Sequence, residues 1–284
     1  MRKLDERELK IMCETIKKDF PDRDDDFYKM FISTEVLRLM VDNEWVSQSL
    51  FQKHAQREKK NLDAFDYFNS AEGGFEWQER VSRFAERIYN LCRVPNIENV
   101  IQDVINGNLV SRFAEIEVGS HLFGRGIKFE FVIPIGQKGK DYDIQILDPL
   151  RVNCEVKHKI ESTSLSENTL TNTIRASNDQ LPIDIPAIIF IKIPERWVFE
   201  PDLIKTIRNS FKPFFQRNRD HIIGIVLRWE QRDSNYEGLF YWKYRLFFNE
   251  NFKTTPQIES FINQLEGERA IGTSFSDIVH KYFH

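Results

Sequence analysis

The sequence predicts an α/β protein of 284 residues, with a helical domain over residues 1–95 and an α/β domain over residues 96–284. Three observations support this prediction. Residues 1–95 show the apolar spacing of helices and few strand signals. Pro95 disfavours helix at the residue before it, which marks a boundary there. After residue 126, short apolar runs alternate with glycine and proline turns, as is typical of strands.

The first domain is predicted to consist of amphipathic helices. Between residues 74 and 95, apolar residues recur at steps of three and four and so share one helix face: Val81, Phe84, Ile88 and Leu91. Upstream, Asp24, Asp25 and Asp26 place negative charge where a helix N-terminus favours it. The charged stretch 47–68 is also predicted to be helical.

The second domain is predicted to alternate helices and strands. Ser166 is a plausible N-cap for a helix, and the nearly unbroken apolar run 187–193 indicates a strand covered on both faces. In order, we expect helices at 97–106 and 109–123, strands at 127–133, 142–147 and 152–156, a helix at 166–180, a strand at 187–193, a helix from Pro201, strands at 221–229 and 239–248, and helices near 255–266 and 273–283.

Composition limits the classes of function. There are 40 basic and 44 acidic residues, giving a net charge of −4, which excludes a uniformly basic nucleic-acid coat protein. A polyanion would have to bind a local basic patch. No apolar run approaches the roughly 20 residues of a membrane helix, and the charged N-terminus does not suit a signal peptide. The three cysteines are far apart, which favours reduced thiols and a cytoplasmic location over a disulfide framework or zinc site.

Residues 139–159 contain the chemically most informative pattern, GKDYDIQILDPLRVNCEVKHK. A turn at Asp148-Pro149 would join two antiparallel strands and bring Asp143 close to Glu155. Glu155 and Lys157 lie two positions apart and therefore on the same face of their strand. Two carboxylates can hold a hard divalent cation, and an ammonium beside them can act on a bound water or a phosphate.

A purely structural alternative exists for this pattern. The chain contains Glu-x-Lys three times, and the copies beginning at Glu8 and Glu58 lie in charged helical surroundings. The pair Glu155 and Lys157 could simply end an edge strand and discourage edge-to-edge pairing. Only this third copy follows an apolar strand with an aspartate at hairpin distance.

The predicted helix at 109–123 carries two further carboxylates. Its apolar residues cover most of the helix circumference, so Glu115 and Glu117 would be partly buried and would need a partner or a metal. Arg112, three residues before Glu115, could satisfy that carboxylate without any catalytic role.

Residues 109–193 resemble the PD-(D/E)XK nucleases, the restriction-endonuclease-like superfamily. The order of helix with Glu, strand, strand with Asp, strand ending in Glu-x-Lys, helix and apolar strand is the order in that family. Asp143 matches the motif aspartate, Glu155 the acidic position and Lys157 the lysine. Glu115 matches the helix glutamate, with Glu117 as the alternative. Tyr142 stands where the family's eponymous proline would be, which is a departure from the pattern.

The resemblance implies a restriction-endonuclease-like core, with a central mixed sheet flanked by helices. It implies a metal-dependent endonuclease of restriction or defence type that hydrolyses phosphodiester bonds, usually in DNA. Asp143, Glu155, Glu115 and the Val156 carbonyl would bind Mg²⁺, with Mn²⁺ as a substitute, and Lys157 would position or activate the attacking water. Whether one metal or two are bound stays open.

Two weaker signals accompany the motif. Arg175 and Gln180, in the helix that follows it, could contact phosphate or sugar, although a solvated helix face is at least an equal alternative. A basic stretch with interleaved phenylalanines could track a phosphate backbone, although its phenylalanines would more commonly be core: Lys205, Arg208, Phe211, Lys212, Phe214, Phe215, Arg217 and Arg219.

The alternative function is a nucleic-acid-binding or protein-interaction protein that keeps the fold without cutting. The helical domain over 1–95 could recognise DNA, form a homodimer or bind a partner subunit, and these options stay open. Cleavage of both strands of a duplex would suit a dimer.

Overall fold

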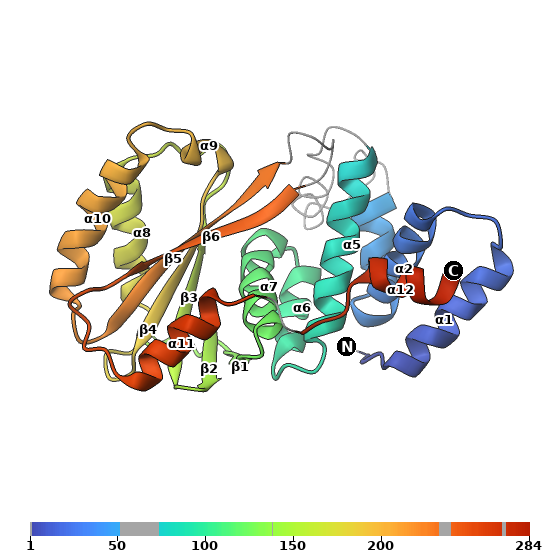
Figure 1. Ribbon diagram of the computed structural model, residues 1–284, viewed down its shortest axis with the longest axis horizontal. Coiled ribbons are helices and arrows are strands. Elements are labelled where there is room, and N and C mark those ends of the chain that lie inside the picture. The colour runs from blue at the N-terminus through green and yellow to red at the C-terminus, as the bar shows by residue number, and fades with distance from the viewer. Residues whose placement is uncertain (1, 52–73, 138, 233–239, 269–270) are drawn as a thin grey trace. The chain divides into compact units, whose positions relative to one another are not determined.

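The computed structural model describes residues 2–51, 74–137, 139–232, 240–268 and 271–284 (Figure 1). These residues form eleven α-helices, one short π-helix and a six-stranded mixed sheet. This confirms the predicted mixture of helices with a central mixed sheet. Across the described residues, no helix is both long enough and apolar enough to cross a lipid bilayer.

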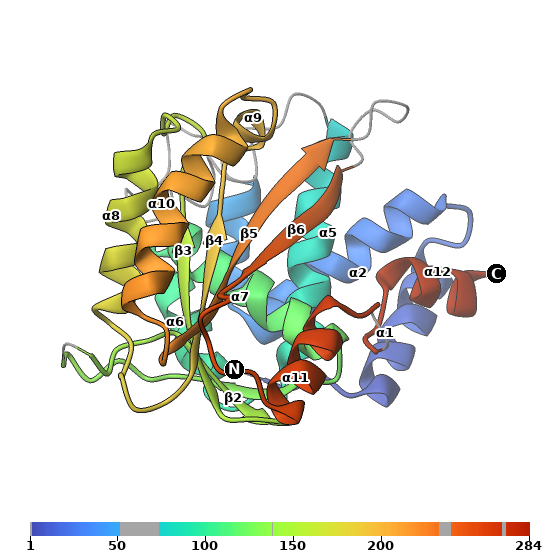
Figure 2. The same ribbon diagram turned by 60° about the vertical axis from the view of Figure 1, so that its left-hand side comes forward.

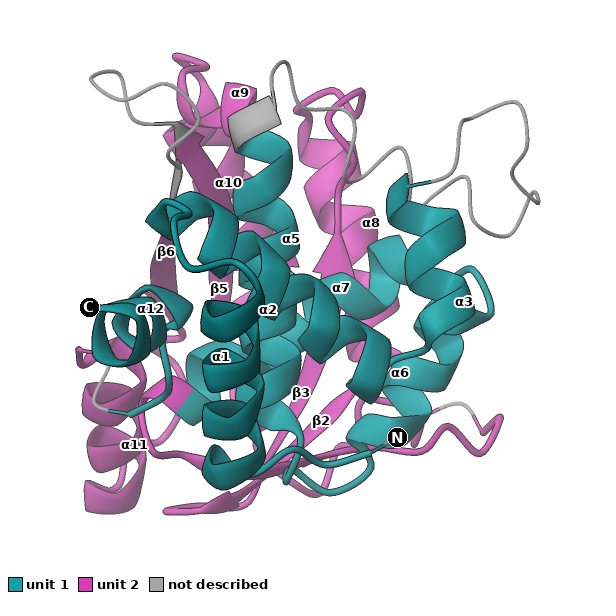
Figure 3. Ribbon diagram, turned by 90° about the vertical axis from the view of Figure 1, so that its right-hand side faces the viewer, with its two compact units in different colours: residues 1–123, 235–239, 271–284 teal, residues 124–234, 240–270 magenta. Residues whose placement is uncertain are grey.

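The chain forms two compact units, which are coloured separately in Figure 3. Unit 1 includes Met1–Phe123 and Ile271–His284, and unit 2 includes Gly124–Ser234 and Phe240–Ala270. The boundary predicted at residue 95 lies within unit 1. As a statement about independently folding domains, that boundary stays a prediction.

Unit 1 is helical in its described parts. The side chain of Asp24 accepts a hydrogen bond from the Phe27 N–H and caps the second helix, as its run of aspartates suggested. The apolar face predicted between residues 74 and 95 is fully buried. The elements are α1 (Glu6–Asp19), α2 (Asp25–Met40), α3 (Asn43–Val46), the π-helix η1 (Ser47–Phe51), α5 (Gly74–Leu91), α6 (Ile97–Ile105), α7 (Leu109–Gly124) and α12 (Phe275–Phe283).

The helix predicted over 47–68 is only partly testable. Residues 47–51 form the π-helix η1, and residues 52–68 lie outside the described part of the chain. The helices predicted at 97–106 and 109–123 are confirmed as α6 and α7.

Unit 2 is built on a sheet in which strand order follows chain order from β1 to β6. The pairs β1–β2, β2–β3 and β5–β6 are antiparallel, and β3–β4 and β4–β5 are parallel. The strands are β1 (Lys128–Phe131), β2 (Ile144–Asp148), β3 (Val152–His158), β4 (Ala187–Lys192), β5 (Ile222–Arg232) and β6 (Phe240–Phe248). The predicted hairpin with its turn at Asp148-Pro149 is therefore confirmed as β2–β3.

Helices α8 (Glu167–Asn178) and α10 (Leu203–Arg217) lie side by side and pack on one face of this sheet (Figure 2). Their apolar side chains form a common core with Ile189, Ile191 and Leu227 of the central strands. All six residues of β4 are buried, which explains why its sequence is a continuous apolar run and not an alternating one.

The remaining helices of unit 2 differ from expectation only in detail. Helix α9 (Glu195–Val198) was not predicted, because four residues are too few to show a periodic pattern. Helix α10 begins at Leu203 and not at Pro201. Helix α11 (Pro256–Glu266) matches its predicted range.

Candidate active site

The β2–β3 hairpin brings Asp143 against strand β3. Because Ile144 pairs with Cys154 in antiparallel register, Asp143 lies beside the backbone that follows Cys154. The Asp143 N–H donates to the Cys154 carbonyl at 3.1 Å, and the Val156 N–H donates to Asp143 Oδ2 at 2.7 Å. The carboxylate is therefore anchored next to Glu155, as the sequence predicted for the hairpin.

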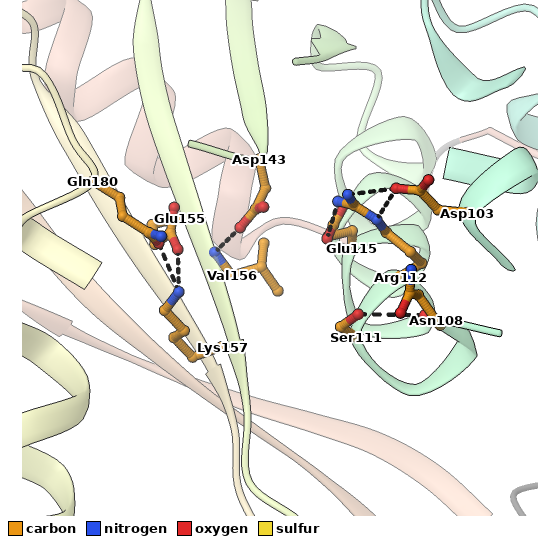
Figure 4. A network of polar contacts seen from close by, with 10 residues as sticks. All are labelled: Asp103, Asn108, Ser111, Arg112, Glu115, Asp143, Glu155, Val156, Lys157 and Gln180. Atoms are coloured by element: carbon orange, nitrogen blue, oxygen red, sulfur yellow. Dashed lines mark hydrogen bonds and ion pairs between the residues drawn. The ribbon is translucent and has the colours of Figure 1, made fainter. Parts of the chain in front are cut away.

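Glu155 and Lys157 share one face of β3, and Gln180 reaches them from the segment after α8 (Figure 4). The Lys157 ammonium donates to Glu155 Oε1 at 2.5 Å and to Gln180 Oε1 at 2.7 Å. Glu155 is 1% exposed, whereas 27% of the Lys157 side chain is exposed. The lysine is therefore oriented by two acceptors while it keeps access to solvent.

Burial raises the pKa of Glu155 to about 8, and the neighbouring Asp143 charge adds to the effect, against the opposing charge of Lys157. Glu155 Oε2 is buried and makes no hydrogen bond. A buried carboxylate oxygen without a partner is costly, so this atom suits a site that a cation would complete.

The residues suit a magnesium ion that keeps part of its water shell better than a metal ion that is coordinated by protein side chains alone. In the described chain, no group of three or more His, Cys, Asp or Glu side chains is placed to hold a metal ion. Magnesium, however, is commonly held by one or two carboxylates while it retains several waters. Asp143 and Glu155 supply two carboxylates. Glu155 Oε2, which has no hydrogen-bond partner, is the atom best suited to coordinate the ion.

Glu115 lies on α7 in unit 1, where Arg112 binds its carboxylate. Arg112 Nη1 donates to both Glu115 oxygens, at 2.7 and 2.9 Å, and the same guanidinium pairs with Asp103 at 2.6 Å (Figure 4). The contact between Arg112 and Glu115, which was predicted as the non-catalytic alternative for this glutamate, is thus present. Glu117 is 1% exposed and lies 3.5 Å from Arg87, again within unit 1.

The residues predicted more weakly to bind substrate differ in whether they contact the candidate site. Gln180 contacts Lys157, as described above, and its predicted contact with substrate stays a prediction. Arg175 is exposed on α8. In the basic stretch on α10, the three phenylalanines are buried, which confirms the core interpretation, and the cations are exposed: Lys205, Arg208, Lys212, Arg217 and Arg219.

The carboxyl ends of β4 and β5 carry a charged cluster that the sequence analysis missed. Lys192 and Arg228 are 8% and 5% exposed, and both lie over the Trp242 ring, with Lys192 Nζ at 4.5 Å and Arg228 Cζ at 5.4 Å from its centre. Lys192 also lies 3.8 Å from Glu230. The signal in the sequence was a lysine inside the otherwise apolar run 187–193.

Comparisons of the chain with protein-family models, with curated proteins and with solved structures give no match. The functional argument therefore depends on the geometry of the site itself.

Proposed function

We propose that the protein is a metal-dependent nuclease that hydrolyses phosphodiester bonds in DNA. The observation that carries the proposal is the arrangement of Asp143, Glu155 and Lys157 on the β2–β3 hairpin, in which a buried carboxylate oxygen of Glu155 has no hydrogen-bond partner. A structural ion pair at a strand end would not require a second carboxylate or a buried atom of this kind.

The order of elements supports the same proposal. Helix α7, the antiparallel strands β1 to β3, helix α8 and the parallel strand β4 follow one another along the chain. This is the order expected from the resemblance to the PD-(D/E)XK nucleases, and we propose a restriction-endonuclease-like core on that basis.

Each side chain of the site would have a different role in hydrolysis. The carboxylates of Asp143 and Glu155, with the Val156 carbonyl, would hold Mg²⁺ or Mn²⁺. When bound, the ion would act as a Lewis acid on the phosphate and lower the pKa of the attacking water. Lys157 would position that water or compensate the negative charge that develops on the phosphate. Gln180 would keep the ammonium in place through its 2.7 Å hydrogen bond.

Glu115 is not needed for this proposal. Because Arg112 already binds both of its carboxylate oxygens, its simplest role is in the ion-pair network of unit 1. The proposal therefore depends on the unit 2 residues alone.

The test is DNA cleavage by the purified protein with Mg²⁺ or Mn²⁺, on plasmid and linear substrates. We expect cleavage that EDTA abolishes. Lys157→Ala or Asp143→Asn should reduce the cleavage rate by about 10³-fold or more, because each removes a group that would stabilise charge on the phosphate or help to activate the attacking water. Lys253→Ala, which removes an exposed lysine outside the site and outside the basic stretch on α10, is the matched control and should cleave normally. Unchanged cleavage in both site variants would contradict the assigned roles.

Binding without turnover separates a nuclease from a non-cleaving binder. In Ca²⁺ and EDTA, a gel-shift assay with the same DNA measures binding alone. Binding of DNA in Ca²⁺ with no cleavage in Mg²⁺ or Mn²⁺ would support the non-cleaving alternative, and no binding under any condition would support the protein-interaction alternative.

A further inference from the structure

A groove of about 660 Å³ lies between α10 and the edge strand β6, within unit 2 and outside the candidate active site. Its floor is aromatic, because Phe211 of α10 meets Phe247 of β6 with their ring centres 5.4 Å apart. Phe211 is buried, whereas Phe247 is only half-buried and so presents part of its ring to the groove.

Three exposed cations line this groove. Arg208 and Lys212 are four residues apart on α10, and Arg245 projects from β6 with its guanidinium 5.3 Å from the centre of the Phe247 ring. Among the described residues, none of the three has a carboxylate within 4.0 Å. Glu250 is the one acidic residue that lines the groove, so in a chain of net charge −4 the groove carries an excess of positive charge.

The groove also borders a free sheet edge. β6 is the last strand in the sheet order, and no described strand pairs with its outer side. Alternate residues of this nine-residue strand therefore offer backbone N–H and C=O groups to an added strand, because the residues between them bond to β5. An edge of this length beside an apolar floor has the features of a strand-addition site.

We propose that the groove binds an extended, acidic protein segment that adds to β6 as a seventh strand. Main-chain hydrogen bonds to β6 would give affinity. On the α10 side of the added strand, where side chains recur at every second residue, an apolar side chain would contact Phe211 and Phe247, and carboxylates would pair with Arg208, Lys212 and Arg245. A second copy of the chain would place identical cations opposite one another, which is unfavourable. Nucleic acid would use the cations but would leave the strand edge unpaired. The proposal does not depend on the nuclease function.

Synthetic peptides of defined charge test this proposal. The probes are a blocked, fluorescently labelled ten-residue peptide with glutamate and valine by turns at its odd positions and threonine at its even positions, and its counterpart with lysine in place of glutamate. The odd positions share one face of the strand, so both the charged and the apolar side chains can enter the groove. We expect the acidic peptide to bind the full-length protein saturably in fluorescence anisotropy and the basic peptide to bind at least about tenfold more weakly. Arg208→Glu and Arg245→Glu should each weaken acidic-peptide binding about tenfold. Arg217→Glu makes the same charge change on α10 outside the groove and should have little effect.

Hydrogen exchange distinguishes strand addition from simple charge attraction. The acidic peptide should slow amide exchange in residues 243–248 of β6. Equal binding of the two peptides, no binding of either, or unchanged exchange in β6 would overturn the proposal. A DNA duplex whose binding is weakened by Arg208→Glu but not by Arg217→Glu would assign the groove to nucleic acid and would also overturn it.

Discussion

At Glu155, burial and a neighbouring charge link protonation to folding. Burial, together with the Asp143 charge, raises the pKa of this carboxyl from its ordinary 4.5 to about 8. Between these pH values the unfolded chain ionises the group while the folded, metal-free protein holds it protonated. The contribution of Glu155 to stability is therefore complete below pH 4.5 and is lost as the pH rises towards 8.

Glu155→Gln removes this titration and gives a test at the scale of one residue. In EDTA, the free energy of unfolding of the wild-type protein should fall between pH 5 and pH 8 more steeply than that of the variant, by about 1 to 3 kcal/mol. Urea unfolding at each pH measures the difference. Parallel pH profiles would mean that Glu155 is ionised in the metal-free fold.

Gln180 is predicted to position Lys157 without itself touching the reacting atoms. Gln180→Leu removes the acceptor of the 2.7 Å hydrogen bond from Lys157. The single-turnover cleavage rate should fall about 10- to 100-fold, because the ammonium loses one of the two acceptors that orient it. DNA affinity in Ca²⁺ should change little. Gln216→Leu, at an exposed position on α10, is the control. An equal loss of affinity and rate would instead indicate that Gln180 contacts DNA.

At the scale of elements, the strands and most helices were predictable because each carries its own periodic or apolar pattern. β3 was predicted to end at Val156 and extends to His158, and the four-residue helix α9 was missed. The hydrogen bond between Lys157 and Gln180 could not be predicted, since it depends on how α8 packs against the sheet. The contact between Arg112 and Glu115 was expected, because a spacing of three residues places them together on one helix.

The start of α8 offers a test of an element that was predicted from its cap. The Ser166 hydroxyl accepts a hydrogen bond from the Thr169 N–H at 3.1 Å, and the helix leads to Gln180. Ser166→Ala should lower the free energy of unfolding by about 1 kcal/mol, whereas Ser166→Asp, which keeps an acceptor at the cap, should cost much less. Urea denaturation of the three proteins measures this, and equal losses in both variants would argue against capping as the cause.

At the scale of the whole molecule, the three cysteines report on the opening of both compact units. Cys13 and Cys92 lie in unit 1 and Cys154 in unit 2, and all three are free and buried. Burial raises the pKa of Cys13 to about 12 and raises those of Cys92 and Cys154 as well. The reactive thiolate is therefore scarce at each position in the folded protein.

A thiol reagent at pH 8 should consequently label almost no cysteine in the native protein and about three per chain in denaturant. Absorbance of the released thiolate gives the count, and mass spectrometry of the labelled peptides identifies each site. Rapid labelling of Cys154 in the native protein would show that the sheet around the candidate site opens readily, contrary to its complete burial.

DNA binding by a chain of net charge −4 has to depend on a local positive region, and salt dependence measures it. Because phosphate contacts release counterions, the logarithm of the binding constant in Ca²⁺ should fall linearly with the logarithm of salt concentration. If the α10–β6 groove binds an acidic protein segment and not DNA, Arg208→Gln should leave this slope unchanged. Lys157→Gln, at the site of cleavage, should reduce the slope by about one. Binding that ignores salt would contradict a phosphate-led interface, and a reduced slope in Arg208→Gln would extend the DNA path to α10.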